Sequence, residues 1–320
     1  MSREKPTVKS CNSRNLRYPC PSISGFPGVT SLFRKQADLD VSDTIALILV
    51  AAAASTLGSL LGLGGGVFMV PVFTLYLGVD EKVAIGASAV AVVLNSVIGS
   101  TNHLKNRFTN LRLAMVLLVT TTAGALVGAL FSVRAPVSIL NAIFGAVLTY
   151  AAVSMLLKRR PTSPALIDLP DPWRLQASFS DSQSANAITY TPVRMPIGLG
   201  VSGFAGTISG MLGVGGGVVQ VPAMNLLMKV PVKAAAGTST FMVGITAVAT
   251  SVVFYADEKL DPTVVTPALI GVLVGAQVGS RLTKRVSAQR LVMIFVVILL
   301  YLGFALMLKA LGVELPGQTA

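Results

Sequence analysis

The sequence predicts an all-α protein that crosses a membrane many times and is built from two similar halves. Hydrophobic residues make up 53% of the 320 residues, and charged residues only 12%. The mean hydropathy is +0.74, so the chain has more apolar surface than a soluble domain of this size can bury. A glycine-rich stretch at residues 62–71 returns at residues 213–222, which is 151 positions later. Together these observations predict two membrane-embedded repeats.

Residues 1–42 form a polar, basic tail in which Glu4 is the only acidic residue before Asp38. This composition is typical of a mobile tail, and it is also found in organellar transit segments, although the apolar core of a secretory signal is missing. Both cysteines, Cys11 and Cys20, lie in the tail. The apolar segments therefore hold no thiol, which excludes a disulfide scaffold or a cysteine relay within the membrane.

Each half contains five apolar runs. The first half spans residues 43–158, with runs at 44–61, 67–78, 83–101, 113–133 and 138–157. A polar linker at residues 159–195 shows no helical or strand periodicity. The second half spans 196–310, with runs at 197–212, 218–228, 234–255, 264–282 and 291–308, and a C-terminal tail covers 311–320. The second run of each half is too short for a full crossing, which needs about 20 apolar residues, and predicts a half-helix, a re-entrant segment or a crossing of a thinned bilayer.

The two halves align without a gap from residue 61 to residue 158 when shifted by 151 positions. The alignment matches Pro71 with Pro222, Lys82 with Lys233, Ser88 with Ser239 and Tyr150 with Tyr301, among others. Chance does not hold this register over about 100 residues, so the pattern indicates a duplication. Gly124 and Gly128 also have glycine counterparts, and small residues four apart predict close helix packing.

The number of crossings in each half decides the symmetry. Five crossings invert the second half relative to the first, whereas four crossings leave the halves parallel. With ten crossings, the basic residues of the links divide fourteen to four, as the positive-inside rule expects. The fourteen are Lys105, Arg107, Arg112, Lys158, Arg159, Arg160, Arg174, Arg194, Lys229, Lys233, Arg281, Lys284, Arg285 and Arg290. This split favours the inverted arrangement, whereas a cytoplasmic basic tail would favour eight crossings and parallel halves.

The glycine-rich stretches predict two breaks in the helices, because each glycine in a helix costs about 1 kcal/mol relative to alanine. A helix that starts after Gly66 or Gly217 exposes unpaired N–H groups and the positive end of its dipole, which is worth about half a charge. Paired breaks in two halves are typical of transporter binding sites. The candidate anion site therefore contains Gly64, Gly65, Gly66, Gly215, Gly216 and Gly217. The alternative is that these glycines only allow helices to pack closely.

Polar side chains near the breaks are candidates for completing this site: Ser88, Asn95, Gln220, Thr238 and Ser239. For each hydroxyl, the alternative is a bond back to a carbonyl of its own helix. His103 is the only histidine and lies near the end of the third run. It is a candidate gate, because imidazole changes charge near neutral pH, and the alternative is a residue at the membrane interface.

The remaining residues argue against several other kinds of site. The acidic residues near the runs, including Asp80, Glu81 and Asp261, are all expected in the links, which speaks against a carboxylate relay or a cation cage. One histidine and no membrane cysteine cannot make a zinc site, and no nucleophile is paired with a base. We therefore expect no metal, no cofactor and no enzymatic activity. The net charge of +12 reflects membrane orientation rather than nucleic-acid binding.

Residues 44–310 resemble the TauE/SafE family of sulfite and organosulfonate exporters. The resemblance rests on Gly62-x-Gly64-Gly65-Gly66 with Val70-Pro71, on Ala84-x-Gly86-x-Ser88 and on the His103-Leu-Lys105 link. It implies a multi-pass permease of the plasma membrane that moves sulfite, sulfoacetate or a related sulfur-containing anion, with export as the leading direction. Phe254 stands where the repeat would place a second histidine, so a symmetric role for His103 is not supported.

Two alternatives remain open, namely an anion channel and an uptake permease for a related organic anion. The partners implied are the small anion and the lipid bilayer, and a homo-oligomer is compatible with the sequence. The sequence names neither the anion nor the coupling ion.

Overall fold

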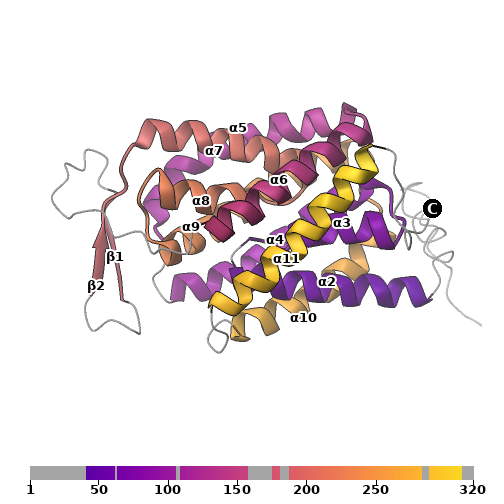
Figure 1. The fold of residues 1–320 in the computed structure, drawn as a ribbon, viewed down its shortest axis with the longest axis horizontal. Helices are drawn as coiled ribbons and strands as arrows, with labels where there is room; N and C mark the ends of the chain where they lie inside the picture. Colours follow the sequence, from indigo (N-terminus) through magenta and orange to yellow (C-terminus); the bar gives the residue numbers. More distant parts are fainter. Residues whose placement is uncertain are drawn as a thin grey trace, which may run out of the picture. The chain divides into compact units, whose positions relative to one another are not determined.

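A computed structural model describes residues 41–61, 63–105, 109–157, 175–180, 187–282 and 288–311. All of these belong to one compact unit, residues 39–320. The described part of the chain is almost entirely helical, and Figure 1 shows its ten labelled helices. Those of the first half are α2 (Val41–Leu61), α3 (Gly66–Tyr76), α4 (Glu81–Lys105), α5 (Leu111–Arg134) and α6 (Val137–Leu157). Those of the second half are α7 (Met195–Leu212), α8 (Gly217–Leu226), α9 (Val232–Ala256), α10 (Pro262–Leu282) and α11 (Ala288–Ala310).

The helices differ in length as the apolar runs predict. Seven of them are long and apolar enough to cross a membrane, and α11 extends over 23 residues. By contrast, α3 has 11 residues and α8 has 10. At 1.5 Å per residue these two helices span roughly 16 Å, about half of a hydrocarbon core that is about 30 Å thick. The predicted polytopic α-helical fold with two helices that start at glycine breaks is confirmed.

Small residues bring two pairs of helices into close contact. A methyl group at Gly124 or Gly128 of α5 would overlap the backbone of Gly203 or Thr207 of α7. Gly275 and Gly279 of α10 lie equally close to the backbone of α2. Figure 1 shows the α5–α7 pair along one edge of the helices and the α2–α10 pair along the opposite edge. The predicted packing role of Gly124 and Gly128 is therefore confirmed.

Helices α4 and α9 occupy equivalent places in the two halves and run in opposite directions where they pack. Near one end, Gly86 of α4 lies against Phe254 of α9. Further along α4, the hydroxyl of Ser96 donates to the carbonyl oxygen of Thr240, 14 residues before Phe254. The contact therefore moves toward the start of α9 as it moves toward the end of α4.

The pair α6 and α11 is also antiparallel. Gly145 of α6 lies against Met307 of α11, whereas Gly303, one turn earlier in α11, lies against Thr149, one turn later in α6. By the same test α2 and α10 are parallel, because Gly271 faces Ile48 and Gly279 faces Thr56. In both of these pairs, α4 with α9 and α6 with α11, helices that the shift of 151 positions matches point in opposite directions.

The polar linker contains a small sheet that periodicity does not predict. Strands β1 (Ala177–Ser180) and β2 (Ala187–Tyr190) pair antiparallel, with Ala177 opposite Tyr190. Four residues are too few to establish a period of two, so the sequence pattern misses these strands. Leu175 and Tyr190 are buried in a cluster with residues of α5, α7 and α9. Burial raises the pKa of the Tyr190 hydroxyl above its ordinary value.

Candidate functional site

The glycine-rich loops form the N-terminal ends of α3 and α8. Gly64 and Gly65 have φ angles of +84° and +81°, and Gly215 and Gly216 have +85° and +73°. Only glycine adopts this left-handed region without steric cost, so the triple glycines allow a sharp turn directly into each helix. Gly65 and Gly216 are the N-cap residues, and neither cap is satisfied by a side chain.

The first turns of α3 and α8 carry unpaired N–H groups. The first backbone bonds run from Phe68 and Met69 to the carbonyl oxygen of Gly65, and from Val219 and Gln220 to that of Gly216. The N–H groups of Gly66, Val67, Gly217 and Val218 have no backbone acceptor within the described ranges. These donors, together with the helix dipoles, make both helix ends electropositive.

The two glycine-rich loops meet. A methyl group at Gly66 would lie 2.8 Å from the carbonyl oxygen of Gly213 and 3.1 Å from the Cα atom of Val214. Val92 of α4 and Val243 of α9, which are equivalent positions 151 apart, both pack against Gly64 and against Gly215. The start of α3 is thus brought against the loop that leads into α8, and two buried valines line the junction.

Ser88 and Ser239 lie one turn before Val92 and Val243, on the same faces of α4 and α9. The Ser88 hydroxyl lies 3.0 Å from the carbonyl oxygen of Gly213, to which it donates, and equally close to that of Ile85 in its own helix. Ser88 therefore holds the second glycine-rich loop in place. Ser239 is fully buried, and its hydroxyl has no hydrogen-bond partner in the described part of the chain.

Gln220 and Asn95 make polar contacts between helices. The Gln220 amide donates to the hydroxyl of Thr121 on α5 over 3.2 Å, while its carbonyl oxygen is buried without a partner among the described residues. Asn95 accepts bonds from two serines of α2, Ser55 at 2.8 Å and Ser59 at 2.6 Å. Of these residues, Gln220 lies in the first turn of α8, whereas Asn95 ties α4 to α2.

The other two predicted residues are placed differently. The Thr238 hydroxyl accepts the backbone N–H of Asn110 over 3.1 Å, which joins α9 to the start of α5. Its oxygen is thus engaged in a structural bond. His103 belongs to α4, three residues after Ser100. Its side chain lies outside what the structure describes, so its role as a gate stays a prediction.

Ser209 lies beside the second glycine-rich loop, and the sequence pattern does not reveal it. It lies in α7, and its Cβ and Oγ atoms are 3.1 and 3.4 Å from the position that a Cβ on Gly216 would take. The residue is 1% exposed, and its hydroxyl has no partner among the residues described. The counterpart of Ser209 in the first half is Gly58, which lies directly against Gly65. Aligning the two halves therefore does not single out Ser209, because the residue matched with it is a glycine rather than a polar residue.

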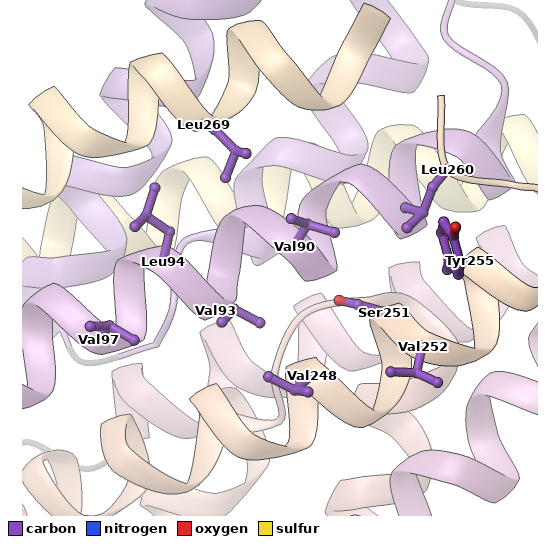
Figure 2. Close-up of a pocket in the computed structure, with 10 residues that line it drawn as sticks. All are labelled: Val90, Val93, Leu94, Val97, Val248, Ser251, Val252, Tyr255, Leu260 and Leu269. Atoms are coloured by element: carbon purple, nitrogen blue, oxygen red, sulfur yellow. The ribbon is translucent and has the colours of Figure 1, made fainter. Parts of the chain in front are cut away.

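An apolar groove of about 460 Å³ lies elsewhere, between α4, α9 and α10. Figure 2 shows its lining, in which Val97, Val248 and Val252 face the hollow and Tyr255 closes one end. The only hydroxyls there belong to Tyr255 and to Ser251, which donates to the carbonyl oxygen of Ala247 in its own helix. Val252 and Tyr255 are exposed, which suits contact with lipid tails. The groove offers no set of donors for an oxyanion.

The described residues contain no group of three His, Cys, Asp or Glu side chains placed to hold a metal ion. The polar groups at the junction of the glycine-rich loops are backbone amides, hydroxyls and one carboxamide. Such a set binds through hydrogen bonds and helix dipoles, and it suits a small anion that must later be released.

The chain is similar to known proteins that are named as probable membrane transporters. The chain is 25% identical to the probable membrane transporter protein YunE of Bacillus subtilis over 83% of this chain and 98% of that protein. It is 26% identical to a probable membrane transporter protein of Xylella fastidiosa over 76% of this chain and 87% of that protein. No solved structure matches the chain.

The family model described as sulfite exporter TauE/SafE matches residues 47–306. That range includes both glycine-rich loops and all ten helices except a few residues at the ends of α2 and α11. With its seven long apolar helices, the protein is a multi-pass membrane transporter. The chain belongs to the sulfite exporter TauE/SafE family.

Proposed function

We propose that the protein moves sulfite or a small organosulfonate across the plasma membrane, with export as the direction. The observation that carries this proposal is the meeting of the two glycine-rich loops, each of which leads into a helix with unpaired N–H groups, beside buried hydroxyls that lack partners among the described residues. Oxyanions are the ligands that free N–H groups and serine hydroxyls bind best. In the proposed site the donors are the N–H groups that open α3 and α8, together with Ser209 and Ser239.

The same site suits a sulfonate with a short organic tail. Phe68 and Met69 follow Gly66 in the first turn of α3, and both are buried. An apolar wall beside a cluster of N–H donors accommodates an anion whose head is charged and whose tail is not. Gln220 and Thr121 add polar groups at the start of α8, where a sulfonate oxygen or a bound water would find a partner.

Competition between anions tests this proposal. We expect unlabelled sulfite and methanesulfonate each to inhibit counterflow of radiolabelled sulfite in proteoliposomes, because both present oxygens on a charged sulfur head. Choline and neutral amino acids should not compete, because helix N-termini repel cations and gain little from a neutral head. Inhibition by choline that equals inhibition by methanesulfonate would reject an anion site.

An anion channel is the second candidate. The unpaired N–H groups would serve a pore as well as a carrier, because both must bind an anion weakly enough to release it. Counterflow separates the two, since a carrier exchanges labelled for unlabelled anion and a channel gives sustained current without exchange.

We also propose that the two halves form an inverted repeat with ten crossings. The antiparallel packing of α4 with α9 and of α6 with α11 supports this arrangement, because parallel halves would run equivalent helices in the same direction. In this arrangement α3 makes one crossing together with the glycine-rich loop that precedes it, and α8 does the same in the second half.

The inverted repeat predicts the sidedness of two basic links. Cysteines placed at Lys105 and at Lys284 should react with an impermeant maleimide from the same side of the membrane. Lys105 is the last residue of α4, whereas Lys284 comes after α10 and lies outside the described residues. Labelling from opposite sides would contradict ten crossings and support eight crossings with parallel halves.

A further inference from the structure

A second polar site lies away from the glycine-rich loops, at the other end of α3. Its centre is Glu81, the first residue of α4, which the sequence places in a link. The structure corrects that expectation, because Glu81 belongs to the helix and is only 5% exposed. The preceding residue, Asp80, is exposed and accepts the backbone N–H groups of Lys82 and Val83. One acidic residue thus caps the helix at the surface, and the next is buried.

The buried carboxylate lacks the partners that an ionised group needs. Neither oxygen of Glu81 has a hydrogen-bond partner among the described residues, and the same holds for the side-chain oxygen of Asn141 on α6. Asn141 is 2% exposed and lies within hydrogen-bonding reach of Glu81. All three oxygens are buried acceptors, and none of them makes a hydrogen bond in the described part of the chain. Leaving such groups unpaired destabilises the folded protein, most of all when one of them is charged.

Binding of one proton to Glu81 supplies a hydrogen-bond donor to this group of oxygens. A protonated Glu81 is neutral, and its O–H group can donate to the oxygen of Asn141, which removes the buried charge and gives that oxygen a donor. A metal cation would instead need several oxygens around it and would be repelled by Lys309, the charged group of α11 that faces Glu81. Lys309 makes no hydrogen bond to the carboxylate, whose oxygens have no partner among the described residues, and its ammonium group donates to the carbonyl oxygen of Thr74 over 3.1 Å.

The cluster of Glu81, Asn141 and Lys309 is linked to α3, the helix that forms one side of the proposed anion site. Thr74 lies in the last turn of α3, whose first turn carries the free N–H groups of Gly66 and Val67. The Lys309 ammonium stabilises the negative end of this helix dipole. Next to it, the Tyr76 and Tyr301 hydroxyls join α3 to α11 over 2.7 Å. A change of charge at Glu81 alters the field around Lys309, and hence the bond that holds the C-terminal end of α3.

We propose that Glu81 is a proton-binding site, shared with Asn141, whose occupancy is coupled to anion movement through α3. The coupling rests on the transport activity proposed above, whereas the proton site does not. The charged groups that face Glu81 are Lys309 from α11 and Asp80 from the preceding link. Lys82 is directed elsewhere, since its ammonium group donates to the carbonyl oxygen of Val133 at the end of α5.

Infrared difference spectroscopy of the purified full-length protein tests the proton site without any substrate. Spectra at acidic minus alkaline pH should contain a carboxylic-acid C=O band that disappears in Glu81→Gln and persists in Asp80→Asn, the matched neighbour. The band should shift in Asn141→Leu, which removes the acceptor. A Glu81→Gln spectrum identical to the wild-type spectrum would overturn the proposal, as would a carboxylate that binds sodium and never shows the acid band.

Flux measurements test the coupling. Methanesulfonate is a suitable probe, because its charge is fixed over the working pH range. We expect a pH gradient to accelerate its flux in wild-type proteoliposomes, and Glu81→Gln to keep counterflow while losing that acceleration. A Glu81→Gln variant that still responds fully to the gradient would overturn the coupling. If the wild-type protein carries neither sulfite nor methanesulfonate, the proposed substrate fails, while the infrared result still decides whether Glu81 binds a proton.

Discussion

Gly65→Val and Gly216→Val should each abolish sulfite transport and leave the protein inserted in the membrane. Both glycines have positive φ angles, which a β-branched residue adopts only at a cost of more than about 1 kcal/mol. Space is also limited, because a Cβ at Gly65 would lie 3.2 Å from the carbonyl oxygen of Ala54 and one at Gly216 would lie 3.1 Å from Cβ of Ser209. The substitution therefore displaces the loop that presents the N–H groups. The apolar runs that drive insertion stay intact.

Gly200→Val is the matched control for these variants. Gly200 lies in α7, and nothing approaches within 4 Å of the position that its Cβ would take. Its valine variant should transport at the wild-type rate.

Gly124→Val should instead lower the yield of folded protein in size-exclusion chromatography, because the new side chain would overlap the backbone of α7. Full transport by both Gly65→Val and Gly216→Val would mean that the glycine-rich loops do not contact the anion.

Much of the fold follows from apolar run length and from glycine. The runs predict the long helices, because about 20 apolar residues are needed to cross the bilayer. Residues 64–66 predict the start of α3, because three consecutive glycines destabilise a continuing helix. The pairing of α5 with α7 and of α2 with α10 could not be predicted, since small residues at a spacing of four show that a helix packs closely and not which helix it meets.

The site could be predicted only in part. The repeated sequence singles out the two glycine-rich loops, and the structure shows that they meet. The repeat does not single out Ser209, because its counterpart Gly58 has no side chain. It also places Glu81 in a link, because hydropathy shows where a run ends and gives no sign that the first residue of α4 is buried. Burial of a residue at a helix end depends on tertiary contacts that one sequence does not reveal.

The central claim is that hydroxyls and helix ends, rather than an ionisable side chain, bind the anion. Ser209→Ala combined with Ser239→Ala removes the two hydroxyls of the proposed site that are buried without a partner among the described residues. Two hydrogen bonds at roughly 1 kcal/mol each correspond to a loss of tenfold or more in apparent sulfite affinity. Ser154→Ala is the control, because Ser154 is a buried serine that bonds to the carbonyl oxygen of Ala151 in its own helix. It should leave the affinity unchanged.

His103→Gln provides the decisive comparison, since His103 is the only histidine in the chain. If it is a gate, its loss should slow transport without abolishing it, because the proposed donors at the glycine-rich loops remain. The measurement is the concentration dependence of sulfite efflux from loaded proteoliposomes for the double serine variant, Ser154→Ala and His103→Gln. We predict weakened affinity in the double serine variant and slowed, measurable efflux in His103→Gln. An inactive His103→Gln beside an unaffected double serine variant would contradict the account and point to a site centred on the histidine.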